Sequence, residues 1–494
     1  MNAPAATLAL LAALAAGLAA APAAAQERPS EEELFGKPDA PPAPPAPPPG
    51  KEPPAAYPAP PAPAAPAPPE QARMETASPQ PAGFGAPPAP PDPLKIGGML
   101  YLRLDTQWQQ GQPISDWVLT SPNLIDLWVD VRPNDRVRGF VLGRAQVNPL
   151  VPETVQASAL GAAVGTQVVL DQAWIRFDIE RVVFVAAGKQ QVTWGNARFW
   201  NPTDFLHFRK RDPLSVFDQR QGEWMLKLHA PWEKAGWNFY GFLLLSGNEV
   251  VDRIGKVGGA LRAEVVLGSL ELAGEVVARS GTLPRLGLEA SFAVWEIDVY
   301  GNASLGRGTP NGLPQWNMTA PPDWQAVPPN PGSYESYQPG FAPQVSAGAS
   351  WTWRYDDLHT LTIGAEYFYN SLGYSDPAIY PWLIVNGQYD PFYVGRNQLG
   401  LYVLIPRPWK WYDTTFILST LANLTDRTFI SRLDYSVLLL TYLRLEAYAS
   451  VHYGVTGGAF RFAIDVPAFP PYLPDPVRIT PPVADFGLAL RLSL

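Results

Sequence analysis

The segment LRLEAYASVH at residues 443–452 is the clearest indication of how this chain folds. Apolar residues occupy every second position, and polar side chains occupy most positions between them. Successive side chains of a β-strand point to opposite faces, so this alternation predicts a strand with one apolar and one polar face. The apolar face carries Leu443, Leu445, Ala447, Ala449 and Val451, and the other face carries Arg444, Glu446, Tyr448, Ser450 and His452.

The same alternation recurs along most of the chain. It is clear at 100–108, 125–131, 172–178 and 485–494. We count about 18 such segments of about ten residues each, which is typical of the strands of a transmembrane barrel. The sequence therefore predicts an all-β fold.

The connections between these segments alternate in length. Short connections lie at 133–135, 180–182, 268–269 and 355–359, and long ones lie at 109–122, 148–166, 195–222, 305–342, 371–396 and 453–482. Short periplasmic turns and long external loops are typical of outer-membrane barrels, and lipid cannot satisfy an open sheet edge. We therefore predict a transmembrane antiparallel up-and-down β-barrel of about 16–18 strands, most simply 18. It would occupy residues 94–494.

The composition fits a membrane barrel better than a soluble β-sandwich. Of the 494 residues, 47% are hydrophobic and 16% are charged, and the charged fraction is below that of ordinary soluble domains. The charged polar faces leave no large core to cover a second sheet, although a soluble secreted β-protein remains an alternative. The lack of Cys excludes disulfides and thiolate chemistry, and the net charge of −9 argues against nucleic acid as a partner.

The N-terminal part of the chain has a different composition. Residues 1–25 carry no charged side chain and end in three alanines, which predicts a cleaved signal peptide, with an uncleaved anchor as the alternative. A short acidic peptide, 26–37, precedes a Pro/Ala-rich segment, 38–93, that we expect to be a disordered, extended linker. This N-terminal arm is either a passive spacer or a periplasmic tether that binds a partner protein.

Tryptophans lie where a membrane interface would place them. Trp232 and Trp237 flank one short connection, and Trp409 and Trp411 lie in another, as an aromatic girdle requires. Trp128 lies in the middle of a predicted strand on its polar face, and the sequence does not explain it.

Residues 188–227, which include the third long connection, contain the most distinctive motifs. These are Trp194-Gly195, Asn201-Pro202-x-Asp204, Arg220-x-Gly222 and the following Trp224-Met225-Leu226-Lys227. The segment resembles a family of uncharacterised, porin-like outer-membrane barrels of Gram-negative bacteria. The resemblance implies a porin-like channel in the outer membrane and implies no enzymatic activity. Within this connection we expect Trp194, Gly195, Asn201, Pro202 and Asp204 to structure the loop.

The third connection also concentrates basic side chains, with five basic residues against three acidic ones. In general porins the third loop folds into the lumen, and rings of side-chain charge set the selectivity of a pore. The candidate constriction residues are Arg198, Asp204, His207, Arg209, Lys210, Arg211, Asp212 and Arg220. Two interpretations stay open, because the charges either favour anions or pair with one another and pack the loop. We expect the loop aromatics to pack the loop rather than to bind sugar.

The predicted function is a channel for small hydrophilic solutes in the outer membrane, with a preference for anions set by the third loop. The alternative is a non-conducting barrel that anchors a periplasmic partner through the N-terminal arm. The long loop 305–342 is a candidate plug in that case. No metal or cofactor motif is present and no Ser/His arrangement is recognisable, so we expect neither a cofactor nor catalysis. A homotrimer is typical of general porins, but the sequence shows no interface.

Overall fold

The computed structural model describes residues 92–150, 165–246, 251–326, 330–356, 359–468 and 476–494. They lie in one compact unit, Pro90–Leu494. The predicted signal peptide, the acidic peptide and nearly all of the Pro/Ala-rich linker lie outside the described residues.

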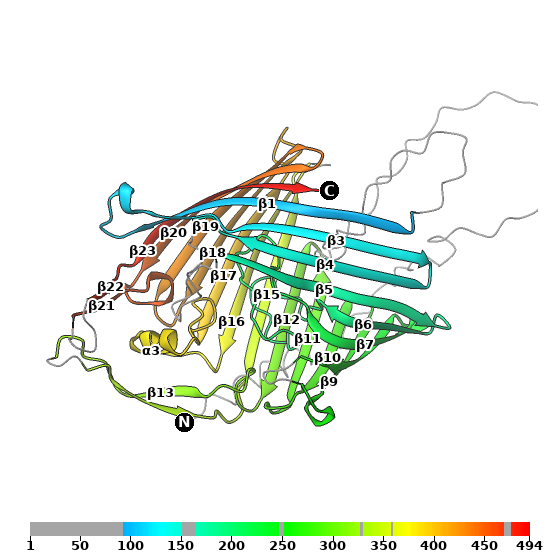
Figure 1. The fold of residues 1–494 in the computed structure, drawn as a ribbon, viewed down its shortest axis with the longest axis horizontal. Coiled ribbons are helices and arrows are strands. Elements are labelled where there is room, and N and C mark those ends of the chain that lie inside the picture. The colour runs from blue at the N-terminus through cyan, green and yellow to red at the C-terminus, as the bar shows by residue number, and fades with distance from the viewer. Residues whose placement is uncertain (1–91, 151–164, 247–250, 327–329, 357–358, 469–475) are drawn as a thin grey trace, which may run out of the picture. The chain divides into compact units, whose positions relative to one another are not determined.

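Eighteen antiparallel strands form a single closed wall (Figure 1). They are β1 (Leu94–Gln109), β3 (Asn123–Asn134), β4 (Val137–Val147), β5 (Thr166–Ile179), β6 (Val183–Gln190), β7 (Glu223–Trp232), β8 (Trp237–Leu244), β9 (Gly258–Leu267), β10 (Leu270–Ala278), β11 (Arg285–Val294), β12 (Ile297–Gly306), β15 (Gln344–Arg354), β16 (Thr360–Asn370), β17 (Asn397–Pro406), β18 (Thr414–Asn423), β19 (Thr428–Leu440), β20 (Leu443–Gly454) and β23 (Pro482–Ser493).

Each strand pairs with the strands before and after it in the chain, and the ring closes between the first and the last. Strand β1 pairs with β3 on one side and with β23 on the other, with Leu102 opposite Leu490. Closure leaves no strand edge unpaired, which is the condition for a sheet surrounded by lipid. The predicted up-and-down barrel of 18 strands is confirmed.

The two faces of the wall differ sharply in polarity. Leu288 in β11 is 66% exposed on the outer face, whereas the next residue, Glu289, points inward and is 6% exposed. The same contrast runs around the ring, with apolar side chains outside and charged ones such as Arg103, Asp126 and Glu366 inside. This arrangement reverses that of a soluble β-sandwich, whose inner face would form an apolar core.

Short turns join the strands at one end of the barrel, as predicted. They lie at 135–136, 180–182, 268–269 and 355–359. At the other end, the connections 279–284 and 424–427, which are not among the predicted long ones, are also short. The second of these is covered by longer neighbouring loops, since Asp426 accepts hydrogen bonds from the Ala459 amide (2.6 Å) and the Tyr380 hydroxyl (2.9 Å).

The long connections contain small elements of their own. These are β2 (Val118–Thr120), β13 (Gln315–Ala320), β14 (Ser333–Tyr337), β21 (Ile464–Val466), β22 (Val477–Ile479), the helix α3 (Tyr380–Val385) and several 3-10 turns. In the β13–β14 hairpin, Tyr334 stacks on Trp382 of α3 and Trp316 meets the same ring edge to face, so this candidate plug packs on another loop. No helix in the described part of the chain is long and apolar enough to cross a membrane.

Exposed aromatic residues collect near the short turns. Trp232 and Trp237 flank the turn between β7 and β8 and contact each other edge to face. Trp295, which the sequence analysis did not single out, lies in the turn between β11 and β12 and is 89% exposed. Trp128 stacks inside the wall on Phe140, which also stacks on Trp174 of β5, and this row explains its place on the polar face.

Candidate functional site

Residues 191–222, which we call the crossing loop, connect β6 to β7 and lie inside the ring of strands (Figure 1). Three groups of apolar side chains attach the loop to three separate parts of the wall. The loop therefore spans the lumen instead of lining one side of it.

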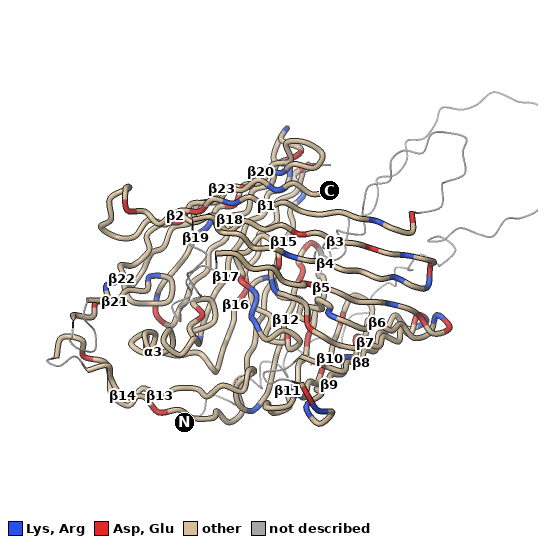
Figure 2. Tube along the Cα trace, viewed as in Figure 1, with Lys and Arg blue, Asp and Glu red and all other residues tan. Residues whose placement is uncertain are grey.

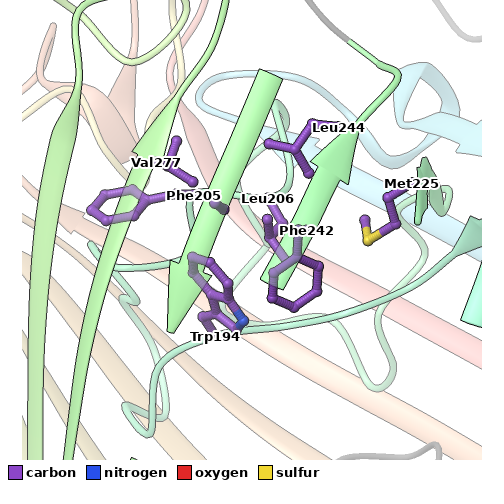
Figure 3. Close-up of a cluster of buried hydrophobic side chains, with 8 residues drawn as sticks. Trp194, Phe205, Leu206, Met225, Phe242, Leu244 and Val277 are labelled. Atoms are coloured by element: carbon purple, nitrogen blue, oxygen red, sulfur yellow. The ribbon is translucent and has the colours of Figure 1, made fainter. Parts of the chain in front are cut away.

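The first attachment is to β7–β10. Trp194, Phe205 and Leu206 of the loop pack against Phe242 and the other inward apolar side chains of these strands (Figure 3). Trp194 meets Phe242 edge to face, with ring centroids 5.4 Å apart. The wall residues in this cluster are Met225, Phe242, Leu244, Ala260 and Val277.

The second attachment is to β16–β19, across the barrel from the first. Trp200 is fully buried and stacks on Phe368, and its indole N–H donates to the Phe392 carbonyl at 2.9 Å. Phe199 lies over Gly400, where any side chain would occupy the same space as the ring. The burial of the Phe199 and Trp200 rings makes this attachment the main apolar contact of the middle of the crossing loop.

The third attachment is at the closure of the barrel. Phe217 packs between Tyr101 of β1, Leu124 of β3 and Ala489 of β23. Nearby, Arg144 of β4 donates to the Gln219 carbonyl at 3.3 Å. The end of the crossing loop is thus held by the first and last strands together.

The predicted loop-structuring residues form a compact turn. Gly195 has φ of +95°, and a side chain there would collide with Asn201. The Asn201 side chain accepts a hydrogen bond from the Ala197 amide at 2.9 Å, and the Asp204 amide donates to the Asn201 carbonyl at 3.3 Å. Pro202 is buried. These contacts set the direction in which the loop leaves the wall.

Part of the predicted charge cluster pairs within the loop. Asp204 binds the side chains of His207 (3.2 Å) and Arg220 (2.7 Å), and Arg220 also forms a bidentate pair with Asp218. Although burial alone would raise it, the pKa of the Asp204 carboxyl is lowered by His207 and Arg220. These charges therefore pair with one another in the interior of the loop.

The remaining basic residues are not paired in this way. Among the described residues, no carboxylate lies within ion-pair distance of Arg198, Arg209, Lys210 or Arg211. Figure 2 marks the positions of the basic and acidic residues along the chain. Arg209 and Asp212 are exposed, and the other three basic residues are half-buried. The crossing loop therefore presents an excess of positive charge.

Burial lowers the pKa of Lys210 to about 8, with Arg285 and Arg220 adding to the effect and Asp204 and Asp390 opposing it. Burial also raises the pKa of Asp390, in the connection 371–396, to about 6; the Phe392 amide opposes this and the charge of Asp212 adds to it. Both groups titrate near neutral pH at the junction of two loops.

The wall opposite contributes guanidinium groups that sequence reasoning missed. Arg198 lies over the Tyr402 ring at 4.0 Å from its centroid, and Arg432 of β19 lies over Tyr448 at 3.8 Å. Arg103 of β1 donates to the Tyr448 hydroxyl at 3.3 Å. Arg103 and Arg432 occupy inward positions of strands far apart in sequence, so only the alternation marked them as polar, without indicating that they meet at Tyr448.

The two tyrosine rings lie flat because the neighbouring strands carry glycine. Tyr402 covers Gly364 and Tyr448 covers Gly487, and a side chain at either glycine would overlap the ring. A guanidinium stacked on an aromatic face keeps its N–H edges free for hydrogen bonds. Arg103 and Arg432 use part of these edges in ion pairs with Asp105 (2.7 Å) and Asp434 (2.6 Å), whereas Arg198 has no carboxylate within ion-pair distance among the described residues.

The other side of the lumen is balanced differently. Arg262 of β9 forms ion pairs with Glu264, Glu275 and Glu289, and the Thr203 hydroxyl of the crossing loop donates to Glu289 at 2.7 Å. One guanidinium shared by three carboxylates gives this cluster more acidic than basic side chains.

No group of three or more His, Cys, Asp or Glu side chains in the described ranges is arranged to hold a metal ion. His207 and His452 hydrogen-bond to Asp204 and Asp485, respectively, and not to a serine hydroxyl.

No protein-family model and no curated protein matches this sequence. Among solved structures, a mutant of the Rhodobacter blastica porin is similar at 10% identity with a TM-score of 0.40, over 81% of this chain and 100% of that one. OccK8 (OprE) of Pseudomonas aeruginosa is similar at 7% identity with a TM-score of 0.47, over 81% of this chain and 98% of that one. Because both TM-scores are low, neither likeness carries a functional conclusion for this chain.

Proposed function

We propose that this protein is an outer-membrane channel through which small hydrophilic solutes diffuse, narrowed by the crossing loop. The observation that carries the proposal is a closed barrel with an apolar outer face and a charged lumen crossed by one anchored loop. An apolar outer face is stable only in lipid, and an 18-stranded ring is wide enough for an aqueous channel unless loops fill it.

The same proposal includes a preference for anions. It is supported by Arg198, Arg209, Lys210 and Arg211 on the loop, which have no carboxylate within ion-pair distance in the described residues. On the wall, Arg103 and Arg432 near Tyr448 are balanced by Asp105 and Asp434. Asp434 interacts electrostatically with Arg103 and Arg198 as well as with its partner Arg432. Positive side chains at a constriction attract anions and repel cations.

The direct test is the conductance of the refolded protein in a planar bilayer under a salt gradient. Discrete current steps are expected, with a reversal potential of the sign that anions produce. A folded, heat-modifiable barrel that passes no current would contradict the channel and favour the anchoring role, in which the N-terminal arm binds a periplasmic partner.

Membrane insertion predicts a specific cost for a charge on the outer face. Leu288→Arg is expected to destabilise the barrel by about 2–4 kcal/mol, because arginine near the bilayer midplane loses its hydration. Urea titration of the protein folded in lipid vesicles measures this cost. The matched change Leu313→Arg, in the connection 307–343, should have little effect, and an equal cost at both positions would argue against a lipid-facing β11.

The titrating groups at the loop junction predict a pH-dependent selectivity. Asp390 gains negative charge as the pH rises through about 6, and Lys210 loses positive charge as it rises through about 8. Both changes weaken anion preference, so the reversal potential should move toward cations in two steps. Lys210→Arg should remove the upper step and keep the lower one, because arginine stays charged throughout. A reversal potential constant from pH 5 to 9.5 would contradict this role.

A further inference from the structure

Glu366 of β16 points into the lumen, is 1% exposed and binds the crossing loop through its backbone. One carboxylate oxygen accepts the Trp200 amide at 2.7 Å, and the other accepts the Arg198 amide at 2.8 Å. The Phe199 amide donates to both oxygens, at 3.1 and 3.2 Å, and the Tyr300 hydroxyl donates at 2.8 Å. A single buried carboxylate thus satisfies three consecutive amides of the loop.

We propose that Glu366 is the positioning residue that holds the crossing loop across the lumen and thereby sets the width and charge of the constriction. The effect on the constriction rests on the proposed channel function. The contact between Glu366 and the loop amides does not depend on whether the barrel conducts. Sequence reasoning had no means to find this residue, because it lies more than one hundred and sixty positions from the amides that it binds.

The loop depends on this carboxylate because its own backbone offers no substitute. Residues 198–200 belong to no helix or strand, so their N–H groups have no ladder partner. Buried N–H groups without an acceptor are strongly unfavourable. The Arg198 guanidinium does not pair with Glu366, since it lies over Tyr402, and the other polar group facing the carboxylate is the Tyr300 hydroxyl.

The three amides also determine where the functional side chains of the loop lie. Fixing the backbone at 198–200 directs Trp200 onto Phe368 and Arg198 onto Tyr402. The unpaired guanidinium at the constriction and the main aromatic anchor therefore both depend on one carboxylate.

The wall itself does not need the Glu366 side chain. In the barrel, β16 pairs with β15 and β17 through this position, with Gly348 and Gly400 as the partners of Glu366. Replacement by the isosteric Gln keeps these backbone bonds. The Gln side chain has an NH₂ group in place of one acceptor oxygen, and this group cannot accept hydrogen bonds from the loop amides.

The test is hydrogen exchange of the amides at 198–200, read by mass spectrometry on the full-length refolded barrel. In Glu366→Gln these amides should exchange about tenfold faster or more than in the wild type, with the barrel still heat-modifiable. The control Glu446→Gln changes another buried, inward Glu whose ion pair is with Arg491 at 2.7 Å, and it should leave 198–200 protected.

Wild-type protection at 198–200 in Glu366→Gln would overturn the proposal. If that variant does not refold, Glu366→Asp gives the same readout, because its shorter carboxylate stops short of the amides. Single-channel recording of the same samples should show a larger and more fluctuating current than in the wild type. A silent wild-type barrel would reject the channel, whereas the exchange result decides the role of Glu366 separately.

Discussion

Reversing Arg209, Lys210 and Arg211 together to glutamate is expected to convert anion preference into cation preference. None of the three pairs with a carboxylate in the described residues, so each reversal replaces a free positive charge by a negative one. Little of the loop's packing should change, because Arg209 is exposed and Tyr393 binds the Arg211 carbonyl, not its side chain. The measurement is the reversal potential of the triple variant in a salt gradient.

A matched control reverses three basic residues in short turns. These are Arg136 between β3 and β4, Arg181 between β5 and β6, and Lys234 between β7 and β8. The total charge changes by the same amount, but at the mouth of the barrel and not at the crossing loop. This control should stay close to the wild-type reversal potential. An unchanged potential in the loop variant would assign its charges to packing alone.

Trp200→Ala is expected to cost about 3–5 kcal/mol, the range for removing a fully buried large aromatic side chain. The substitution removes the stacking on Phe368, at 5.8 Å between ring centroids, and the hydrogen bond to Phe392. The crossing loop then loses its largest aromatic contact with β16–β19, so single-channel conductance should rise. Urea unfolding in detergent and single-channel recording measure the two effects.

The exposed Trp295 supplies the comparison for this variant. Trp295→Ala should change the free energy of unfolding much less and should leave the conductance unaltered. If the free energy of unfolding of Trp200→Ala lies within about 1 kcal/mol of the wild-type value, the contacts of Trp200 do not hold the loop.

The barrel was predictable because strand alternation is a local property. Each segment such as 443–452 shows its two faces without reference to any other part of the chain, and counting the segments gives the strand number. The short connections 279–284 and 424–427 were not anticipated, because loop length depends on which neighbours cover the barrel end.

The site was predictable only in part, for a physical reason. The motif residues of the crossing loop stand together in the sequence, so their composition showed the excess of basic side chains. Which of them pair depends on three-dimensional contacts, and Arg220 is paired while Arg198 is not. Glu366 reaches the loop amides from β16, and Arg103 and Arg432 meet at Tyr448 from strands far apart in the sequence. No local pattern indicates such meetings.

The position of Phe217 has a consequence for the order of assembly. Its ring contacts β1, β3 and β23, so its binding surface is complete only when the first and last strands have paired. Those strands are about 390 residues apart along the chain, and bringing such distant segments together is slow and entropically costly. Phe217 can therefore reach its complete contact surface only when β1 and β23 have paired. The last pairing step of the wall thus also completes the site that holds the end of the crossing loop.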